Sequence, residues 1–415
     1  MTTLESQGAL AKKAARVLST ADTNTKNAAL DAIAKEILSR KEEWLSANAK
    51  DMEAAAKNGM IPAMQDRLKL NDSRIEDIVK GIREIIDIDD PVGVRMSENI
   101  RPNGLKIEKV SVPIGVIAII YEARPNVTVD AAVLTLKSGN AVILRGGKEA
   151  INSNMAVVKI MQDALKKAGL PGECISLVED TSRDSANELM NLRDYVDLLI
   201  PRGGRGLIRS VCENASVPVI RTGEGVCHVY IDKEADLEMG ARILFNAKCS
   251  RPSVCNAAEC AIVHEDVVKD FLKIAKPMLD EKNVEYRCDE KSVDCFGKQA
   301  SLATAEDWDS EYDDYILAVK TVSGVEEAID FITEHGTGHS EAIVTKNEKT
   351  AEKFLNSVDA AAVYWNASTR FTDGGEFGLG AEIGISTQKM HARGPMGLSE
   401  MTSYKYVITG NGQVR

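Results

Sequence analysis

The chain has 415 residues, of which 51 are Lys or Arg and 63 are Asp or Glu, so its formal net charge at pH 7 is −12. This acidic balance argues against a protein that binds nucleic acid or anionic membranes non-specifically, because both need basic surface. With 44% hydrophobic and 27% charged residues the composition is that of a globular protein, and the length predicts two to three domains.

The first part of the chain carries helical patterns. Residues 3–58 place Ala, Leu and Ile at steps of three and four among Lys and Glu, which predicts helices that end at Gly59. Another amphipathic helix is expected near Ser73–Ile86. The period then changes, since residues 102–110 alternate apolar and polar side chains after Asn103 and Gly104, and an Asn-Gly pair is the strongest short signal for a β-hairpin.

From Val116 onward strands and helices alternate. Most of the expected strands are continuous apolar runs, as parallel strands buried on both faces require. The strands are expected at Val116–Tyr121, Ala141–Leu144, Ile175–Val178 and Val196–Ile200, and the helices at Val127–Leu136, Asn152–Lys167, Asp184–Leu192 and Gly206–Glu213. This array predicts a Rossmann-like domain.

A second alternation follows Asp232. Its strands are expected at Glu259–Val263, Ile316–Val319 and Glu341–Val344, and its helices at Leu237–Ala247, Asp266–Leu279, Val325–Glu334 and Glu348–Val358. Pro252 disfavours helix at Arg251, so the stretch from Cys249 to Cys255 is predicted to be a loop. The C-terminal tail, residues 403–408, is rich in β-forming residues, but its pairing partner stays open.

The chain gives no sign of a membrane span, a secretory signal or a zinc site. Val112–Tyr121 is among its longest apolar runs and is about half of the roughly 20 residues that a bilayer requires. The N-terminus lacks a basic segment followed by an apolar one. The eight cysteines contain no C-x-x-C pair and are too sparse for a disulfide scaffold. We therefore expect a cytoplasmic protein in which one cysteine could be a nucleophile.

Cys255 is the candidate nucleophile. It lies at the junction of the two arrays, a usual position for a cleft. A reactive thiolate needs positive surroundings, and Lys248 and Arg251 lie close to it in the sequence. A buried structural cysteine is the alternative, and from this context alone it is the commoner case.

Asn126 follows the first strand of the Rossmann-like array, at the carboxyl end where ligand sites gather. Its amide could stabilise an oxyanion, but Asn is also a favoured helix N-cap, and position alone favours the cap. Arg145-Gly146-Gly147-Lys148 follows the next strand, and Gly203 and Gly204 follow the strand at Val196. Such loops bind phosphates or simply turn the chain, and the pattern fits both.

Five segments together are far more specific. They are residues 121–128, 251–257, 338–345, 366–371 and 377–397. Taken with the arrays, they resemble the aldehyde dehydrogenase superfamily and, within it, the family of gamma-glutamyl phosphate reductases, over essentially the whole chain. The resemblance implies an aldehyde dehydrogenase-like α/β fold and the NADPH-dependent reduction of L-glutamyl 5-phosphate to L-glutamate 5-semialdehyde and phosphate, the second step of proline biosynthesis from glutamate.

The resemblance also implies roles for individual residues. Cys255 would be the nucleophile, and Asn126 with the Cys255 backbone N–H would form the oxyanion hole. NADP(H) would lie along Arg145, Gly146, Gly147 and Lys148, with Gly203 and Gly204 also at the cofactor and Glu311 holding the nicotinamide ribose. Arg124, Arg251 and Arg370 are candidates for binding the substrate, each with a structural ion pair as the equal alternative. No metal ligand is implied.

The implied architecture has three parts. A Rossmann-like NADP-binding domain would comprise residues 1–98 and 113–231 with part of 365–395, and an α/β catalytic domain would comprise residues 232–364. A small β oligomerisation element would comprise the hairpin at 99–112 and the tail at 396–415. The expected partners are a second copy of the chain, in a homo-oligomer, and glutamate 5-kinase through a functional association.

One departure from the superfamily bears on the reaction. Hydrolytic aldehyde dehydrogenases carry a glutamate base in an E-L-G-G-K segment, whereas Thr222 occupies the matching position here. Without that base water is poorly activated, which leaves phosphate as the acyl acceptor or leaving group. Glu224 lies two residues away, so a hydrolytic, non-phosphorylating semialdehyde dehydrogenase is the alternative. A non-enzymatic assembly subunit is a third interpretation, against which the intact Cys255 and Asn126 speak.

Overall fold

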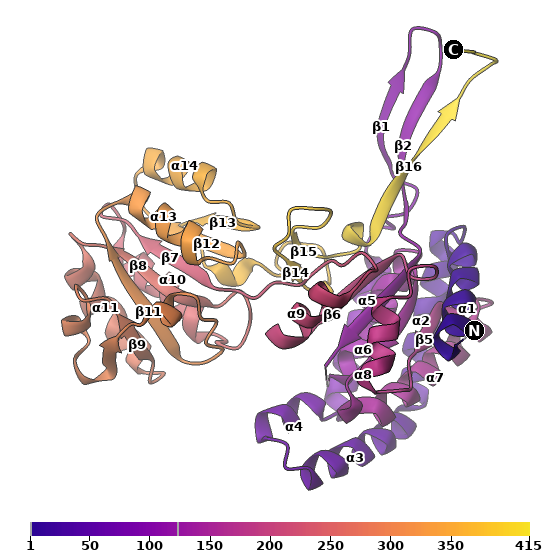
Figure 1. Cartoon of the computed structure of the whole chain (residues 1–415), viewed down its shortest axis with the longest axis horizontal. Helices are drawn as coiled ribbons and strands as arrows, with labels where there is room; N and C mark the ends of the chain where they lie inside the picture. Colours follow the sequence, from indigo (N-terminus) through magenta and orange to yellow (C-terminus); the bar gives the residue numbers. More distant parts are fainter. Residues whose placement is uncertain (1, 123) are drawn as a thin grey trace. The chain divides into compact units, whose positions relative to one another are not determined.

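The computed structural model describes residues 2–122 and 124–415, and the chain divides into two compact units. Unit 1 comprises Met1–Thr222, Gly378–Gly384 and Met396–Arg415, and unit 2 comprises Gly223–Phe377 and Ile385–Pro395. Figure 1 colours the chain by sequence and labels the elements of each unit. Within the part of the chain that the structure describes, no helix combines the length and the apolar character that a bilayer crossing requires.

Unit 1 opens with five helices, of which all but α4 lie in segments where helices were expected. They are α1 (Thr3–Leu18), α2 (Thr23–Ser39), α3 (Lys41–Lys57), α4 (Pro62–Leu68) and α5 (Asp72–Asp87). Polar caps fix where they start: the Asn71 side chain, for example, accepts a hydrogen bond from the amide of Arg74 at the start of α5. One face of α2 is buried, as the three- and four-residue spacing predicts, and its side chains include the fully buried Leu30, Ile33 and Ile37.

The sheet of unit 1 is a parallel Rossmann-like array, as predicted. Its strands lie in the order β5-β4-β3-β6. The strands are β3 (Val116–Tyr121), β4 (Ala141–Arg145), β5 (Ile175–Leu177) and β6 (Leu198–Arg202), and the helices are α6 (Pro125–Lys137), α7 (Ile151–Lys167), α8 (Arg183–Met190) and α9 (Arg205–Asn214). The chain runs outward from β3 to β5 and then returns to place β6 on the other side of β3. This reversal makes a topological switch point at the carboxyl ends of β3 and β6, where ligands bind in such sheets.

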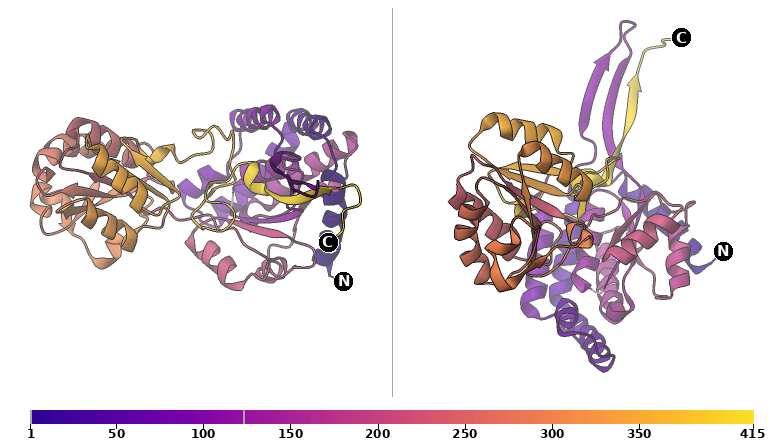
Figure 2. Two further views of the ribbon diagram at one scale, coloured as in Figure 1. Left: turned by 90° about the horizontal axis from the view of Figure 1, so that it is seen from above. Right: turned by 60° about the vertical axis from the view of Figure 1, so that its left-hand side comes forward.

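Three antiparallel strands form an arm on unit 1. The predicted hairpin is confirmed as β1 (Arg95–Ile100) and β2 (Lys106–Pro113), with Gly104 at a positive φ of 84° in its turn. The tail forms β16 (Thr402–Thr409), which pairs with β2 along eight residues. Figures 1 and 2 show these strands standing out from the rest of unit 1. The arm is therefore a sheet with two open edges.

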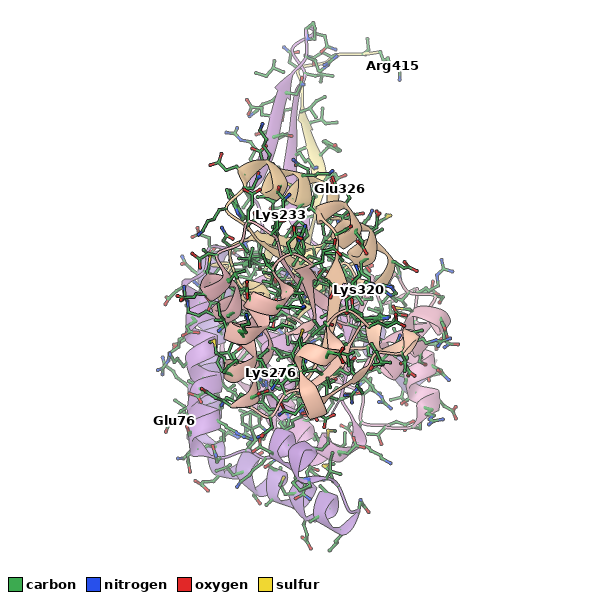
Figure 3. All side chains as sticks on the ribbon, turned by 90° about the vertical axis from the view of Figure 1, so that its left-hand side faces the viewer. Glu76, Lys233, Lys276, Lys320, Glu326 and Arg415 are labelled. Atoms are coloured by element: carbon green, nitrogen blue, oxygen red, sulfur yellow. The ribbon has the colours of Figure 1, made fainter. Side chains whose placement is uncertain are left out.

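Unit 2 contains a seven-stranded parallel sheet in the order β10-β9-β11-β8-β7-β12-β13. Alternate residues of its central strands face opposite sides: Val229 and Ile231 join the core under α10 and α11, whereas Tyr230 joins the core under α13 and α14. The strands are β7 (Cys227–Ile231), β8 (Ala258–His264), β9 (Glu285–Cys288), β10 (Ala300–Leu302), β11 (Ile316–Val322), β12 (Ser340–Val344) and β13 (Ala362–Trp365), and the helices are α10 (Leu237–Cys249), α11 (Val268–Asp280), α12 (Ala305–Trp308), α13 (Val325–His335) and α14 (Glu348–Ser357). Charged side chains such as Lys233, Lys276 and Glu326 project from the outside of this unit (Figure 3).

The boundary between the units differs from the predicted one after residue 231. It falls after Thr222, because β7 is hydrogen bonded to β8 and β12 in the sheet of unit 2. Residues 365–377 and 385–395 also belong to unit 2, which leaves 378–384 as the part of that segment in unit 1. Strand β7 itself is absent from the predicted elements, and so are β9, β10 and β13. His228 interrupts the apolar pattern of β7, although its side chain is fully buried. A histidine can be buried here because its Nδ1 lies 2.9 Å from Glu341 Oε2 on β12.

Candidate active site

Cys255 lies in the predicted loop between α10 and β8. Helix α10 ends at Cys249, and the chain stays irregular through Pro252 and Cys255 before β8 begins at Ala258. Cys255 is only partly buried, whereas Cys174, Cys249 and Cys260 are buried. The loop therefore gives Cys255 the accessibility that a nucleophile needs and that a structural core cysteine lacks.

The backbone of Cys255 is held by residues just before and at the start of β7. Gly225 packs against it so closely that a Cβ at this glycine would overlap the Cys255 carbonyl group. The Sγ–H of the buried Cys227 donates to the Cys255 carbonyl oxygen at 3.2 Å. The amide of Gly225 donates to Glu311 Oε1 at 3.1 Å. Through Gly225, the structure thus brings the carboxylate of Glu311 into the neighbourhood of Cys255.

Two of the three predicted substrate arginines lie near the thiol. Arg370 follows β13, and its guanidinium donates to the Asn256 side chain and, at 3.1 Å, to Ser250 Oγ. Burial lowers the pKa of Arg370 and the charge of Arg251 lowers it further, while Asp373 and Cys255 oppose the fall. Arg370 therefore interacts electrostatically with both Arg251 and Cys255, and a cation beside a thiol stabilises its thiolate. Arg124 is an exposed residue of unit 1.

A buried polar network lies beneath the Cys255 loop. His339 Nδ1 lies 3.7 Å from Cys227 Sγ and 2.8 Å from Ser340 Oγ. The Ser340 hydroxyl reaches Thr372 Oγ1 at 2.6 Å, and the Tyr364 hydroxyl reaches the same atom at 2.7 Å. Burial lowers the pKa of His339 to about 4, so this histidine is neutral at pH 7. Cys227 and His339 were not among the predicted site residues, although His339 lies in one of the five family-like segments.

In unit 1, Asn126 lies in the first turn of α6 and is not the helix cap. Arg124 is the N-cap and makes no side-chain capping bond, and Pro125 is the first helical residue. The Asn126 Nδ2 instead donates to Asp130 Oδ2 at 3.1 Å. The N-cap interpretation is therefore wrong. An exposed amide at a helix N-terminus, at the switch point of the sheet, is well placed to stabilise negative charge.

Arg145 and Lys148, the two cations of the loop after β4, have different surroundings. Arg145 Nη2 donates to the carbonyl oxygens of Thr181 and Ser182 at 2.8 and 2.9 Å. Burial lowers the pKa of Arg145, and nearby Asp180 opposes the fall. Lys148 is exposed. Arg145 thus braces the neighbouring loop, and Lys148 is the cation of this segment that faces solvent.

Glycine is also required here for packing. A Cβ at Gly146 would overlap the Asn154 side chain and lie 3.1 Å from the Tyr121 ring. After β6, a Cβ at Gly203 would lie 2.7 Å from the Glu122 carboxyl carbon, and the amide of Gly204 donates to Glu122 Oε1 at 3.2 Å. The N-terminus of α9 therefore already holds a carboxylate, which a cofactor phosphate at Gly203 and Gly204 would have to displace.

Thr222 is not a candidate base. It is buried, and its hydroxyl donates to the Pro201 carbonyl oxygen at 3.0 Å. Glu224 is partly buried. Among the residues that the structure describes, no group of three or more His, Cys, Asp or Glu side chains is arranged to hold a metal ion.

Comparison with known proteins decides the family. Residues 3–302 and 308–407 match the model of the aldehyde dehydrogenase family. A gamma-glutamyl phosphate reductase of Clostridium perfringens is 58% identical over 410 residues, which are 99% of this chain and 98% of the relative. One of Clostridium beijerinckii is 55% identical over the full length of both chains.

The chain belongs to the gamma-glutamyl phosphate reductase branch of the aldehyde dehydrogenase family. A crystal structure of gamma-glutamyl phosphate reductase from Thermotoga maritima is 47% identical, covers 100% of both chains and superimposes with a TM-score of 0.98. The resemblance drawn from the five segments is thereby confirmed, and so is the aldehyde dehydrogenase-like α/β fold. What each residue of this gamma-glutamyl phosphate reductase family member does stays a prediction, which the contacts described above support to different degrees.

Proposed function

We propose that this protein reduces L-glutamyl 5-phosphate to L-glutamate 5-semialdehyde with release of phosphate, the second step of proline biosynthesis from glutamate. Relatives that are 58% and 55% identical over almost the whole chain carry the name of this activity. The observation in the site that carries the proposal is the accessible Cys255 with Arg251 and Arg370 around it. A thiolate beside two guanidinium groups suits a doubly anionic acyl phosphate.

The mechanism begins with attack of the Cys255 thiolate on the acyl carbon of the substrate. As the C–O bond to phosphate breaks, inorganic phosphate leaves and a thioester remains on Cys255. The Asn126 amide and the Cys255 backbone N–H donate to the carbonyl oxygen while it carries negative charge. Arg251 and Arg370 neutralise the anionic groups of the substrate and the departing phosphate.

NADPH, when bound, supplies the hydride that reduces the thioester carbon. The available residues fit such a cofactor: Lys148 offers an exposed cation for a 2′-phosphate, and the Glu311 carboxylate offers an acceptor for ribose hydroxyls. A cofactor phosphate at Gly203 and Gly204 would take the place of the Glu122 carboxylate that the Gly204 amide binds. Cys255 is then released as the C–S bond of the reduced adduct breaks, which frees the aldehyde and restores the thiolate.

The hydrolytic, non-phosphorylating reaction is less favoured for two reasons. Thr222 cannot activate water, and the relatives carry the name gamma-glutamyl phosphate reductase. The reaction run in reverse separates the two. Oxidation of glutamate 5-semialdehyde by NADP⁺ should require inorganic phosphate, because phosphate must cleave the thioester. Undiminished turnover without phosphate, or full activity of Cys255→Ala, would contradict the proposal.

The arm supports a further part of the proposal, a homo-oligomer. Both edges of the arm sheet, β1 and β16, lack a further strand partner among the described residues, and Ile100 and Ile408 are 67% and 60% exposed. Open edges with exposed apolar side chains favour association. We assign the arm to contacts with a second copy of the chain.

The chemistry of the reaction also supports proposals for a partner enzyme and for a cellular location. The substrate is an acyl phosphate, which a glutamate 5-kinase must supply, so we propose a functional association with that enzyme. The mechanism needs Cys255 in its reduced form, and none of the eight cysteines, all of which lie in the described part of the chain, forms a disulfide. A reducing compartment maintains that state, so we propose a cytoplasmic location.

A further inference from the structure

We propose that Asp130 is a positioning residue that turns the Asn126 amide toward the oxyanion during acyl transfer. This inference rests on the proposed function and concerns a residue to which that function assigns no role. Asp130 follows Asn126 by four residues on α6, so the two side chains lie on one face of the helix. Asn126 Nδ2 donates to Asp130 Oδ2 at 3.1 Å.

The chemistry of the pair fixes the orientation of the amide. An Asn side chain presents an oxygen on one side and an NH₂ group on the other, and rotation by about 180° exchanges them. An ionised carboxylate can only accept hydrogen bonds, so it draws the NH₂ group and repels the oxygen. One N–H of Asn126 then binds Asp130, and the second N–H of the same nitrogen is left to donate to a substrate oxygen.

Burial raises the pKa of Asp130 to about 6, while the hydrogen bond from Asn126 and the positive charge of Arg202, at the end of β6, oppose the rise. The guanidinium of Arg202 packs closely against Gly384, since a Cβ on that glycine would lie 2.5 Å from Arg202 Nη1. Asp130 is therefore ionised above about pH 6 and protonated below it.

Among the described residues, the side-chain hydrogen bonds that join the middle of α6 to β3 and α7 are made by neutral groups, since Thr128 contacts Tyr121 and Asn154. Lys137, whose ammonium donates to Asn27 of α2 and to the Ile86 carbonyl oxygen of α5, lies at the C-terminal end of α6. The ionisation of Asp130 is thus governed by burial, by the hydrogen bond from Asn126 and by Arg202.

Protonation of Asp130 gives the expected pH dependence. A neutral carboxyl can donate as well as accept, so the Asn126 oxygen can turn toward it and the amide loses its fixed orientation. We expect kcat to fall as the pH drops through about 6. KM for the substrate should change little, because the oxyanion exists only in the transition state.

The test compares four variants of the full-length enzyme in the phosphate-releasing reduction. Asn126→Ala should lower kcat by about 10² to 10³. Asp130→Ala, which keeps the donor but not its orientation, should lower kcat by about 10-fold. Asp130→Asn can donate as well as accept and cannot titrate, so it should behave like the protonated carboxyl, with kcat already lowered at pH 7.5 and no further fall near pH 6. Asp31→Ala, which breaks an exposed i,i+4 ion pair on α2, is the matched control and should leave kcat unchanged.

The double variant Asn126→Ala, Asp130→Ala decides whether Asp130 acts through Asn126. If it does, the second substitution should cost nothing further in kcat once the amide is gone. A wild-type kcat for Asp130→Ala, an additive loss in the double variant, or an acid fall retained by Asp130→Asn would each overturn the inference. An unchanged kcat in Asn126→Ala would also overturn the inference, but it would leave the proposed reductase activity standing. A wild-type enzyme that is inactive on the acyl phosphate would instead overturn the proposed function itself.

Discussion

Gly225 shows how closely the nucleophile is packed at the residue scale. Its lack of a side chain lets the chain before β7 lie directly against the carbonyl group of Cys255, while its amide binds Glu311. A methyl group there has nowhere to go, because the atoms it would meet are backbone. The position of the Cys255 loop therefore depends on this glycine.

Gly225→Ala should lower kcat at least 10²-fold, since a displacement of about 1 Å at the reacting atom has effects of that size. Steady-state assays of the purified variant measure this, with circular dichroism to show that it is folded. Gly324→Ala is the matched control in unit 2, because Gly324 has an extended backbone and a Cβ there would meet only Glu326 Oε2, at an ordinary contact distance of 3.5 Å. Equal activity of both variants would show that the Cys255 loop tolerates the shift.

Lys148 and Arg145 should differ in their effect on the cofactor. Lys148→Ala should raise KM for NADPH about 10-fold and leave KM for NADH nearly unchanged, because an exposed lysine can pair with a 2′-phosphate that NADH lacks. Arg145→Ala should instead lower stability, since its guanidinium binds the Thr181 and Ser182 carbonyl oxygens. Equal changes in KM for both cofactors on Lys148→Ala would remove it from the 2′-phosphate site.

The site could be predicted from sequence where the signal is local. Cys255 and Asn126 stand in family-like segments, and the four-residue spacing to Asp130 would have revealed the partner of Asn126. The contacts between Cys227 and His339 and between Arg145 and Ser182 join residues far apart in the chain. No spacing rule reports such contacts, because the fold alone brings these residues together.

At the scale of elements, a buried ion pair ties α10 to β8 on either side of the Cys255 loop. Lys248 Nζ lies 2.6 Å from Glu259 Oε2, and both side chains are almost fully buried. Burial raises the pKa of Glu259, and Lys248 opposes the rise. Removing one partner of such a pair leaves the other buried and unpaired, which is strongly destabilising.

Lys248→Met should lower the free energy of unfolding by about 3 to 5 kcal/mol, as urea denaturation would show. Lys273→Met, which breaks an exposed ion pair with Asp270 on α11, should cause no measurable change. If both substitutions had the same small effect, the buried pair would not be what holds α10 to β8.

Elements with one clear period or apolar run could be predicted, whereas β7, whose apolar run a buried polar residue interrupts, could not. The fully buried apolar run of β3 and the amphipathic α5 appear where they were expected. Strand β7 was missed because His228 breaks its apolar run, and only the partner Glu341 on β12 explains why a histidine can be buried there.

At the scale of the whole molecule, the arm predicts an assembly. Ile100→Glu combined with Ile408→Glu places charge on the exposed apolar residues of β1 and β16 and should lower the oligomeric state, as analytical ultracentrifugation would show. Leu10→Glu, a comparable change on α1 where Leu10 is 46% exposed, is the control. An unchanged sedimentation coefficient in the arm variant would place the interface elsewhere.

The charge of the whole chain is negative, yet both proposed ligands are anions. A few cations supply local positive charge in a protein of net charge −12. They are Arg251 and Arg370 near Cys255 and Lys148 after β4. Binding of the acyl phosphate should accordingly depend on these few residues and not on a basic surface.

The central claim is that the acyl group passes through a thioester on Cys255 that phosphate, and not water, cleaves. Rapid mixing of the enzyme with glutamate 5-semialdehyde and NADP⁺ in the absence of phosphate tests it most directly. The account predicts a burst of about one NADPH per active subunit, followed by a stall that addition of phosphate relieves, and no burst in Cys255→Ser. Continuous turnover without phosphate, or a burst in Cys255→Ser, would contradict it.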